Sequence, residues 1–108
     1  TQFLDRPVKD KSNLAPEAIR QAEDALFRAI ACLRSAEECS DFFRDLCTPA
    51  ELQALVDRWT VVGLLREGLT YREINARTGV SVTTIGRVAR FLAEGFGGYR
   101  RVVERMDN

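Results

Sequence analysis

Three polar side chains recur at helical spacing in the segment SVTTIGRVARFL, residues 81–92: Thr83, Arg87 and Arg90. Residues three or four positions apart share one face of a helix, so these side chains are expected to project together. Arginine carries a planar fork of donors that suits phosphate groups and base edges, and a threonine can contact base edges through its hydroxyl or methyl group. The chemistry available to this face is therefore recognition of a nucleic acid rather than bond making.

The opposite face of the same segment is apolar. Ile85, Val88 and Leu92 follow one another at intervals of three and four, so we expect them to pack inward. Ser81 is a preferred helix N-cap, and the free N–H groups at a helix start form a natural phosphate site. The short side chains near that start would let the backbone approach base edges. Besides Ser81, the positions expected to face DNA are Val82, Thr83, Gly86, Arg87 and Arg90.

A second short helix is expected immediately before this one. Thr70 and Glu73 form an S/T-x-x-E capping box that opens it, and Gly79 stands where a helix-ending residue with positive φ is required. Ile74 would pack against the second helix, with Val80 filling the corner. Two short helices joined by a tight glycine turn define a helix-turn-helix, here over residues 70–92. An αα-corner inside a helical core, without a DNA role, is the alternative interpretation.

The remaining segments predict an all-α fold of about six helices. Residues 1–13 show no periodicity and are expected to form a flexible arm, with residues 14–108 as a single helical domain. Pro16 suits a first helical turn, and capping boxes begin at Ser35 and Thr48. Gly68 suits a helix end, and no alternating strand pattern is sustained anywhere. A last helix is expected to carry one apolar stripe, made of Tyr99, Val102, Val103 and Met106.

The helix expected from Pro49 to about Glu67 is apolar on two sides. Most of its large side chains share one side, and Val61, Leu64 and Leu65 fall on the other. A helix with this pattern must be buried all round, and so small a chain can hardly supply that much cover. We therefore expect a homodimer with interleaved helices.

Composition limits the other possibilities. The chain has 108 residues and no net charge, but residues 58–108 carry nine arginines against five acids. No apolar run approaches the roughly 20 residues that a bilayer span requires, and no secretion leader is evident, so a cytoplasmic protein without a membrane partner is expected.

Neither a metal site nor an enzyme is expected. The three cysteines, Cys32, Cys39 and Cys47, have no CxxC spacing, and there is no histidine; we expect reduced core residues rather than metal ligands. No phosphate-cradling glycine loop is present, and no serine or cysteine lies beside a plausible base. No catalytic residues and no cofactor are therefore assigned.

From Leu46 onward the sequence resembles the Trp repressor superfamily, most closely its YerC/YecD-type branch of small bacterial proteins. The similarity covers roughly residues 22–106. The segments that carry it are LCTPAELQALVDRW (46–59), GLLREGLTYREI (63–74), TGVSVTTIGR (78–87) and GYRRVVER (98–105). The resemblance implies an intertwined helical dimer that binds an operator in double-stranded DNA and represses transcription. It also implies phosphate contacts for Arg72 and Thr84.

The resemblance further implies a small-molecule site beside the second helix of the motif. In tryptophan repressors the bound amino acid is contacted at positions that match Thr48, Arg58 and Arg87 here. Val88 stands where the family has a glycine lining the ligand slot, and Trp59 adds a bulky ring beside Arg58. A full indole would have less room, which favours a different amino acid or related co-repressor of a biosynthetic operon. Histidine is compatible with the resemblance alone.

Two functions remain after this reasoning. The first is a dimeric, sequence-specific transcriptional repressor with a metabolite as co-repressor. The alternative is a helical protein-interaction module that uses the helix-turn-helix as a docking surface. Affinity that falls steeply with salt would identify the first, because DNA binding releases condensed counterions.

Overall fold

The structure is a computed structural model that describes residues 15–108, and the predicted arm at residues 1–13 lies outside this range. The described part contains six α-helices and no strand, which confirms the all-α prediction. The helices are α1 (Pro16–Ala31), α2 (Ala36–Leu46), α3 (Pro49–Arg66), α4 (Tyr71–Thr78), α5 (Val82–Glu94) and α6 (Gly98–Asp107).

The chain divides into two units whose boundary lies within α2, between Phe42 and Phe43. The first unit contains α1 and most of α2, and the second contains α3 to α6. The single domain expected over residues 14–108 stays a prediction.

Local interactions account for the helices of the first unit. Pro16 occupies the start of α1, as predicted, and exposed ion pairs join Arg20 to Glu17 and Arg28 to Asp24. No residue of α1 or α2 is fully buried.

The capping box predicted at Ser35 differs in one bond from the standard form. The Ser35 hydroxyl accepts a hydrogen bond from the Glu38 N–H at 3.0 Å, as a cap does. The Glu38 carboxylate, however, accepts from the N–H of Arg34, one residue before the cap, at 2.9 Å. Both bonds still satisfy backbone donors at the start of α2.

The cysteine prediction is partly wrong. All three thiols are free, but Cys32 is exposed and Cys39 and Cys47 are only half-buried. The reason is that α1 and α2 have no fully buried face, so an apolar neighbour in sequence does not place a cysteine in the core.

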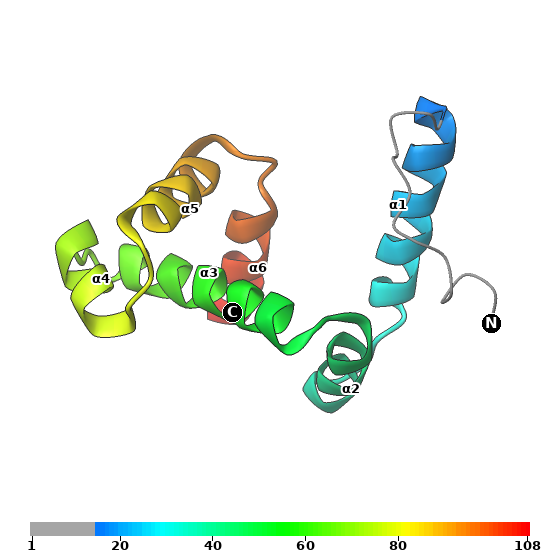
Figure 1. The fold of residues 1–108 in the computed structure, drawn as a ribbon, viewed down its shortest axis with the longest axis horizontal. Coiled ribbons are helices and arrows are strands. Elements are labelled where there is room, and N and C mark those ends of the chain that lie inside the picture. Colours follow the sequence, from blue (N-terminus) through cyan, green and yellow to red (C-terminus); the bar gives the residue numbers. More distant parts are fainter. Residues whose placement is uncertain (1–14) are drawn as a thin grey trace. The chain divides into compact units, whose positions relative to one another are not determined.

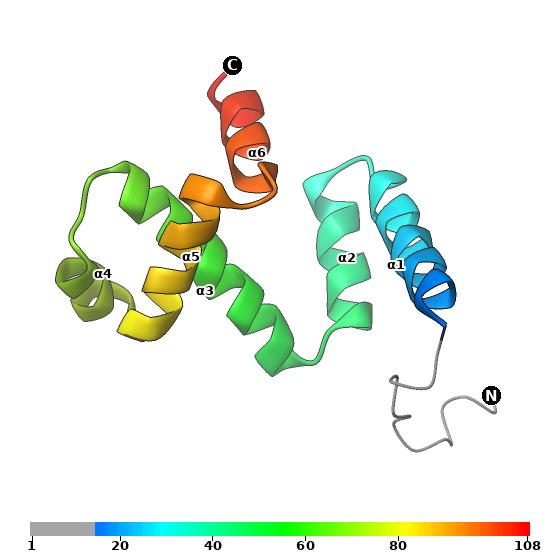
Figure 2. The ribbon, with the colours of Figure 1, turned by 90° about the horizontal axis from the view of Figure 1, so that it is seen from above.

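The second unit is built around α3, with α5 lying across it and α4 beside both (Figures 1 and 2). Ile74, Ile85 and Val88, the predicted wedge between the two motif helices, are at most 1% exposed, and Val80 closes the corner. Val61 and Val62 complete this core from α3. The segments of the motif are thus fixed by a small core that lies entirely within this unit.

One chain covers α3 incompletely. Val61 and Val62 are fully buried, whereas Leu55, Val56 and Trp59 remain 39–49% exposed. On α6, Tyr99 and Val103 pack against the core, while Val102 and Met106 stay exposed. The predicted stripe of α6 therefore divides into a packed half and an exposed half. The exposed half is apolar, like the uncovered side chains of α3.

Candidate nucleic-acid interface and adjoining pocket

The capping box predicted at the start of α4 is present. The Thr70 hydroxyl accepts from the Glu73 N–H at 3.1 Å, and the Glu73 carboxylate accepts from the Thr70 N–H at 2.9 Å. The backbone N–H of Thr70, and after it the Thr70 side chain, lower the pKa of Glu73, because hydrogen bonds to the carboxylate favour its charged form. The start of the motif is thus fixed by contacts over three residues of sequence.

The turn between α4 and α5 is held by a closed set of hydrogen bonds. Gly79 has φ 76°, the left-handed conformation that only glycine adopts readily, and its N–H bonds to the Asn75 carbonyl. The Asn75 side chain donates to the Val80 carbonyl at 2.8 Å. The Thr78 hydroxyl donates to the Ile74 carbonyl and accepts from the Val80 N–H. Asn75 therefore ties α4 to the turn.

Ser81 caps α5, as predicted. Its hydroxyl oxygen accepts from the Thr84 N–H at 3.1 Å and lies 3.0 Å from the Thr84 hydroxyl. Val82 is 54% exposed and Thr83 is exposed as well. The first turn of α5 thus presents a cap, a methyl-bearing pair of side chains and free backbone donors to the outside.

Gly86 lies one helical turn further along, where the ring of Tyr71 covers it. A Cβ at this position would stand 3.8 Å from the Tyr71 ring, an ordinary van der Waals contact. Tyr71 itself is exposed and belongs to the first turn of α4. Arg72, the predicted phosphate contact on that turn, is also exposed.

The two arginines of α5 share one aromatic support that sequence reasoning did not identify. The guanidinium carbon of Arg87 lies 4.6 Å from the centroid of the Phe91 ring, and that of Arg90 lies 5.1 Å from it. Such cation–π contacts orient a guanidinium without neutralising its charge. Phe91 stands four residues after Arg87 and one after Arg90, so helical spacing was the signal that could have indicated it.

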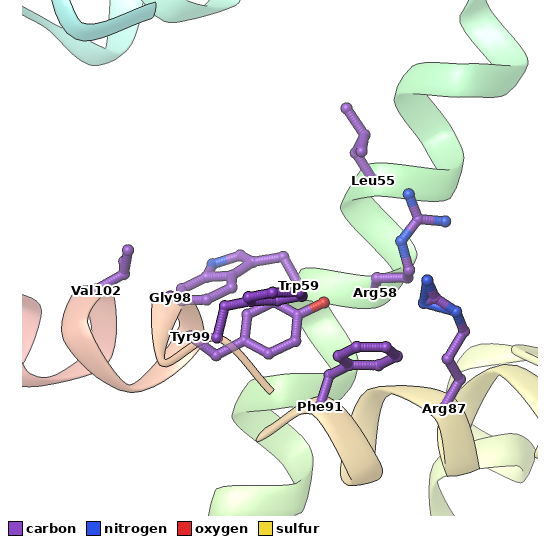
Figure 3. Close-up of a pocket in the computed structure, with 9 residues that line it drawn as sticks. Leu55, Arg58, Trp59, Arg87, Phe91, Gly98, Tyr99 and Val102 are labelled. Atoms are coloured by element: carbon purple, nitrogen blue, oxygen red, sulfur yellow. The ribbon is translucent and has the colours of Figure 1, made fainter. Parts of the chain in front are cut away.

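A pocket of about 680 Å³ adjoins this helix and lies between α3, α5 and α6 (Figure 3). Arg58 and Arg87, both expected at a ligand, line it together. The rings of Trp59 and Tyr99 stand 6.3 Å apart, centroid to centroid, at an angle of 39°. The remaining lining residues are Leu55, Phe91, Phe96, Gly98 and Val102.

Two residues expected at the ligand lie outside this pocket. Thr48 is the N-cap of α3, where its hydroxyl accepts from the Glu51 N–H. Val88 is 1% exposed and belongs to the core, so its side chain points away from the pocket that its helix lines. Arg58 forms no ion pair with a carboxylate of the described residues.

The last helix is tied to both other walls of the pocket. The Arg100 side chain donates to the Leu92 carbonyl at 3.0 Å and to the Ala93 carbonyl at 2.8 Å, which satisfies the C-terminal end of α5. Arg66 of α3 pairs with Asp107 of α6 at 2.7 Å. The position of α6 is therefore coupled to the end of the predicted reading helix.

Among the described residues there is neither a candidate metal site nor a helix suited to a membrane. Within residues 15–108 no group of three histidine, cysteine or acidic side chains could hold a metal ion. In the same range no helix has the length and apolar character needed to cross a bilayer.

The fold and this surface together define a helix-turn-helix protein of the all-α class with a pocket against its second motif helix. The model of the Trp repressor protein family matches residues 21–107, and the chain belongs to this family.

Relatives in sequence and structure agree with this assignment. The chain is 46% identical over 83 residues to the uncharacterized protein YerC of Bacillus subtilis strain 168, covering 77% of this chain and 80% of YerC. A crystal structure of a TrpR-like protein from Eubacterium eligens ATCC 27750 superimposes with a TM-score of 0.75 at 46% identity, covering 81% of this chain and 90% of that one. The crystal structure of a protein from Staphylococcus aureus, described as a putative Trp repressor, superimposes with a TM-score of 0.74 at 38% identity. The match covers 93% of this chain and 96% of that one.

Proposed function

We propose that this protein is a sequence-specific, dimeric DNA-binding repressor of transcription that works in the cytoplasm under the control of a small molecule. The observation that supports this most strongly is the first half of α5. Its start is capped by Ser81, its inner face is locked by Ile85 and Val88, and Val82 and Thr83 are left exposed. A rigid helix that offers short side chains at its exposed start suits the major groove of DNA.

Charge and geometry support a duplex as the partner. Arg87 and Arg90 stack on Phe91, and no described carboxylate pairs with either of them. An arginine whose charge is not neutralised internally remains available for phosphate oxygens or for a guanine edge. Arg72 and Thr84 would add phosphate contacts on either side of the turn, whereas Gly86, expected to face DNA, lies beneath the Tyr71 ring.

The proposed dimer follows from the uncovered side chains of α3 and α6. A soluble chain seldom leaves so many large apolar groups in water, and a second copy would cover them symmetrically. The apolar face consists of Leu55, Val56, Trp59, Val102 and Met106 of these helices and Phe96 of the loop before α6. Four of these residues, Leu55, Trp59, Phe96 and Val102, also line the pocket, so the second copy would lie against it. A symmetric pair would place two reading helices about 34 Å apart, one turn of duplex, and so requires a near-palindromic operator.

The proposed effector site is the pocket between α3, α5 and α6. Arg58 and Arg87 could hold an anionic group, and Arg87 belongs to the reading helix itself. A ligand held by both arginines would fix the position of α5 relative to α3 and thereby change the affinity for DNA, as a co-repressor of a biosynthetic operon does. Thr48 could reach such a ligand only from elsewhere in the dimer, because it does not line this pocket.

The direct test is a binding-site selection with the purified full chain and fragmented genomic DNA. We expect enrichment of a near-palindromic sequence whose half-sites lie about one helical turn apart. Repeating the selection with a panel of amino acids and related acids would show which compound changes the recovery. Recovery of no common sequence under any condition would contradict the proposal.

A further inference from the structure

The C-terminal end of α5 is held by a side chain of the following helix. Arg100 of α6 donates from Nε to the Leu92 carbonyl at 3.0 Å and from Nη2 to the Ala93 carbonyl at 2.8 Å. A guanidinium presents its donors in a rigid planar fork, so one arginine can span two consecutive carbonyls. The Phe91 carbonyl accepts from the Gly95 N–H at 2.9 Å. Three successive carbonyls at the end of α5 are therefore satisfied, two of them by Arg100.

The junction between α5 and α6, residues 92–100, follows a path that requires a glycine. A Cβ at Gly95 would stand 2.4 Å from the Phe91 carbonyl oxygen, which is closer than a side-chain carbon can approach backbone. Because position 95 carries no side chain, the chain can turn at the end of α5 and lead directly into α6 (Figure 2). This turn brings Arg100 within reach of the helix that precedes it.

The helix that carries Arg100 is itself fixed to other parts of the unit. Tyr99 and Val103 of α6 pack against the core. At the far end of α6, Asp107 pairs with Arg66 of α3 at 2.7 Å. This ion pair is exposed and adds little by itself, so the apolar packing is the main support. A contact from α6 to α5 therefore ties the end of α5 to the core and not to a loose segment.

The two ends of α5 are held by different parts of the chain. At its start, Ser81 caps the helix and the Asn75 side chain holds the turn through the Val80 carbonyl. These contacts fix where α5 begins, but not the direction in which it continues. The direction is set by the apolar inner face and by the hold of Arg100 on the last turn.

We propose that Arg100 is a positioning residue for DNA recognition, which sets the angle at which the exposed start of α5 meets the groove. The proposal rests on the proposed function of α5 as the reading helix. Hydrogen bonds to base edges depend closely on distance and direction, whereas attraction to phosphates depends mainly on the number of charges. An altered angle of α5 should therefore weaken specific binding and leave non-specific binding unchanged.

The test compares the full-length wild type with Arg100→Gln on two labelled duplexes of equal length, the selected operator and a scrambled sequence. Fluorescence anisotropy would be measured at several salt concentrations and at a temperature where circular dichroism shows the variant to be folded. We expect at least about a tenfold loss of affinity for the operator, the scale of one specific contact, and no loss for the scrambled duplex. The salt dependence of operator binding should stay the same, because no phosphate contact is removed.

Arg101→Gln is the matched control. It removes the same charge from the next residue of α6, which is exposed and whose side chain forms no hydrogen bond with α5 in the described part of the chain. Its operator affinity should equal that of the wild type. An equal loss in both variants would indicate an effect of net charge and overturn the proposal. A loss on both duplexes with a shallower salt dependence for Arg100→Gln would overturn it too, because Arg100 would then contact phosphate.

Gly95→Ala tests the same junction without changing any charge. The added Cβ must displace the backbone at the end of α5, so we expect the same selective loss on the operator. If Arg100→Gln does not fold, this variant decides the question. Failure of both variants to fold would show that the junction supports the whole unit and would overturn the positioning role.

Failure of the positioning role can be distinguished from failure of the proposed function. A wild-type chain that selects no operator would remove both. A wild-type chain that binds its operator with strong salt dependence, and an Arg100→Gln variant that binds it equally well, would remove Arg100 alone.

Discussion

The helix-turn-helix and the apolar face of α3 and α6 lie in the same unit but bury their apolar side chains to different extents. In the motif, Ile74, Ile85 and Val88 are buried by neighbours within the unit, and the turn closes its own hydrogen bonds. On the apolar face, Val56 and Met106 remain open to solvent. The motif is therefore complete within one chain, whereas its spacing on DNA would depend on the second chain of the proposed dimer.

This contrast assigns separate roles to the two regions. A substitution in the buried core of the motif should destabilise each protomer, and a substitution on the apolar face should leave the protomer folded but dissociate the proposed dimer. Substitutions on the outer surface of α5 should do neither and should weaken DNA binding. The following predictions proceed from the largest expected effect to the smallest.

Ile85→Ala should give the largest loss, because this side chain is fully buried between α5 and the rest of the core. A cavity of this kind costs about 2–5 kcal/mol of unfolding free energy. Urea denaturation followed by circular dichroism would measure it, with Val82→Ala as the exposed control that should change stability by less than about 0.5 kcal/mol. A similar small effect of both variants would show that the motif core does not support the fold.

Val56→Asp should dissociate the proposed dimer while the helices stay intact. Each carboxylate would be desolvated in the interface without a partner, so we expect at least about a hundredfold weaker association. Analytical ultracentrifugation would compare it with Ala76→Asp, which places the same charge on an exposed position of α4. A wild-type protein that sediments as a monomer at micromolar concentration would remove the dimer from the account.

Arg87→Ala should weaken operator binding by about 1–3 kcal/mol, the range for one specific arginine contact. It should also reduce the response to any ligand of the pocket, because Arg87 lines that pocket as well. Fluorescence anisotropy with a labelled operator would give both values. Normal affinity and a normal ligand response in this variant would exclude Arg87 from both roles.

Thr70→Ala should destabilise the chain by about 1 kcal/mol, the usual cost of losing a helix cap. The hydroxyl that accepts from Glu73 would be missing, while the apolar core would be unchanged. Thr70→Ser keeps the hydroxyl and should retain most of the stability in thermal unfolding. Equal losses for alanine and serine would show that the methyl group, not the cap, is responsible.

The smallest expected effect is a dependence of the stability on acidic pH. The pKa of Glu73 is lowered in the folded chain by its bonds from Thr70, so the stabilisation is present above the unfolded-state pKa and is lost as pH falls through the folded one. The wild type should therefore have a higher melting temperature than Glu73→Gln at neutral pH. This difference should disappear at a pH below the usual pKa range of glutamate. A difference that does not change with pH would contradict this origin.

Sequence reasoning was most successful where interactions are local. The caps at Thr48, Thr70 and Ser81 and the positive φ of Gly68 and Gly79 were all predicted and are all present. Each depends on residues no more than a few positions apart, which a pattern can encode. The same holds for the buried positions of α5, because helical periodicity fixes the inner face.

The pocket could be predicted only in part. Arg58 and Arg87 came from resemblance to the family, and the structure places both in its lining. Trp59 was expected beside Arg58, but Tyr99 was not expected there, because the two rings meet only after α3 and α6 pack together. Val88 was expected at the ligand but belongs to the core. It follows Arg87 directly, and successive residues of a helix point about 100° apart.

The most direct test of the central claim is the affinity of the wild-type chain for its selected operator as a function of salt. If α5 presents its arginines to a duplex, the affinity should fall by orders of magnitude between about 50 and about 200 mM salt, and Arg72→Gln should make that dependence shallower. An affinity that does not change over this range would contradict DNA recognition and favour docking of the helix-turn-helix on a protein.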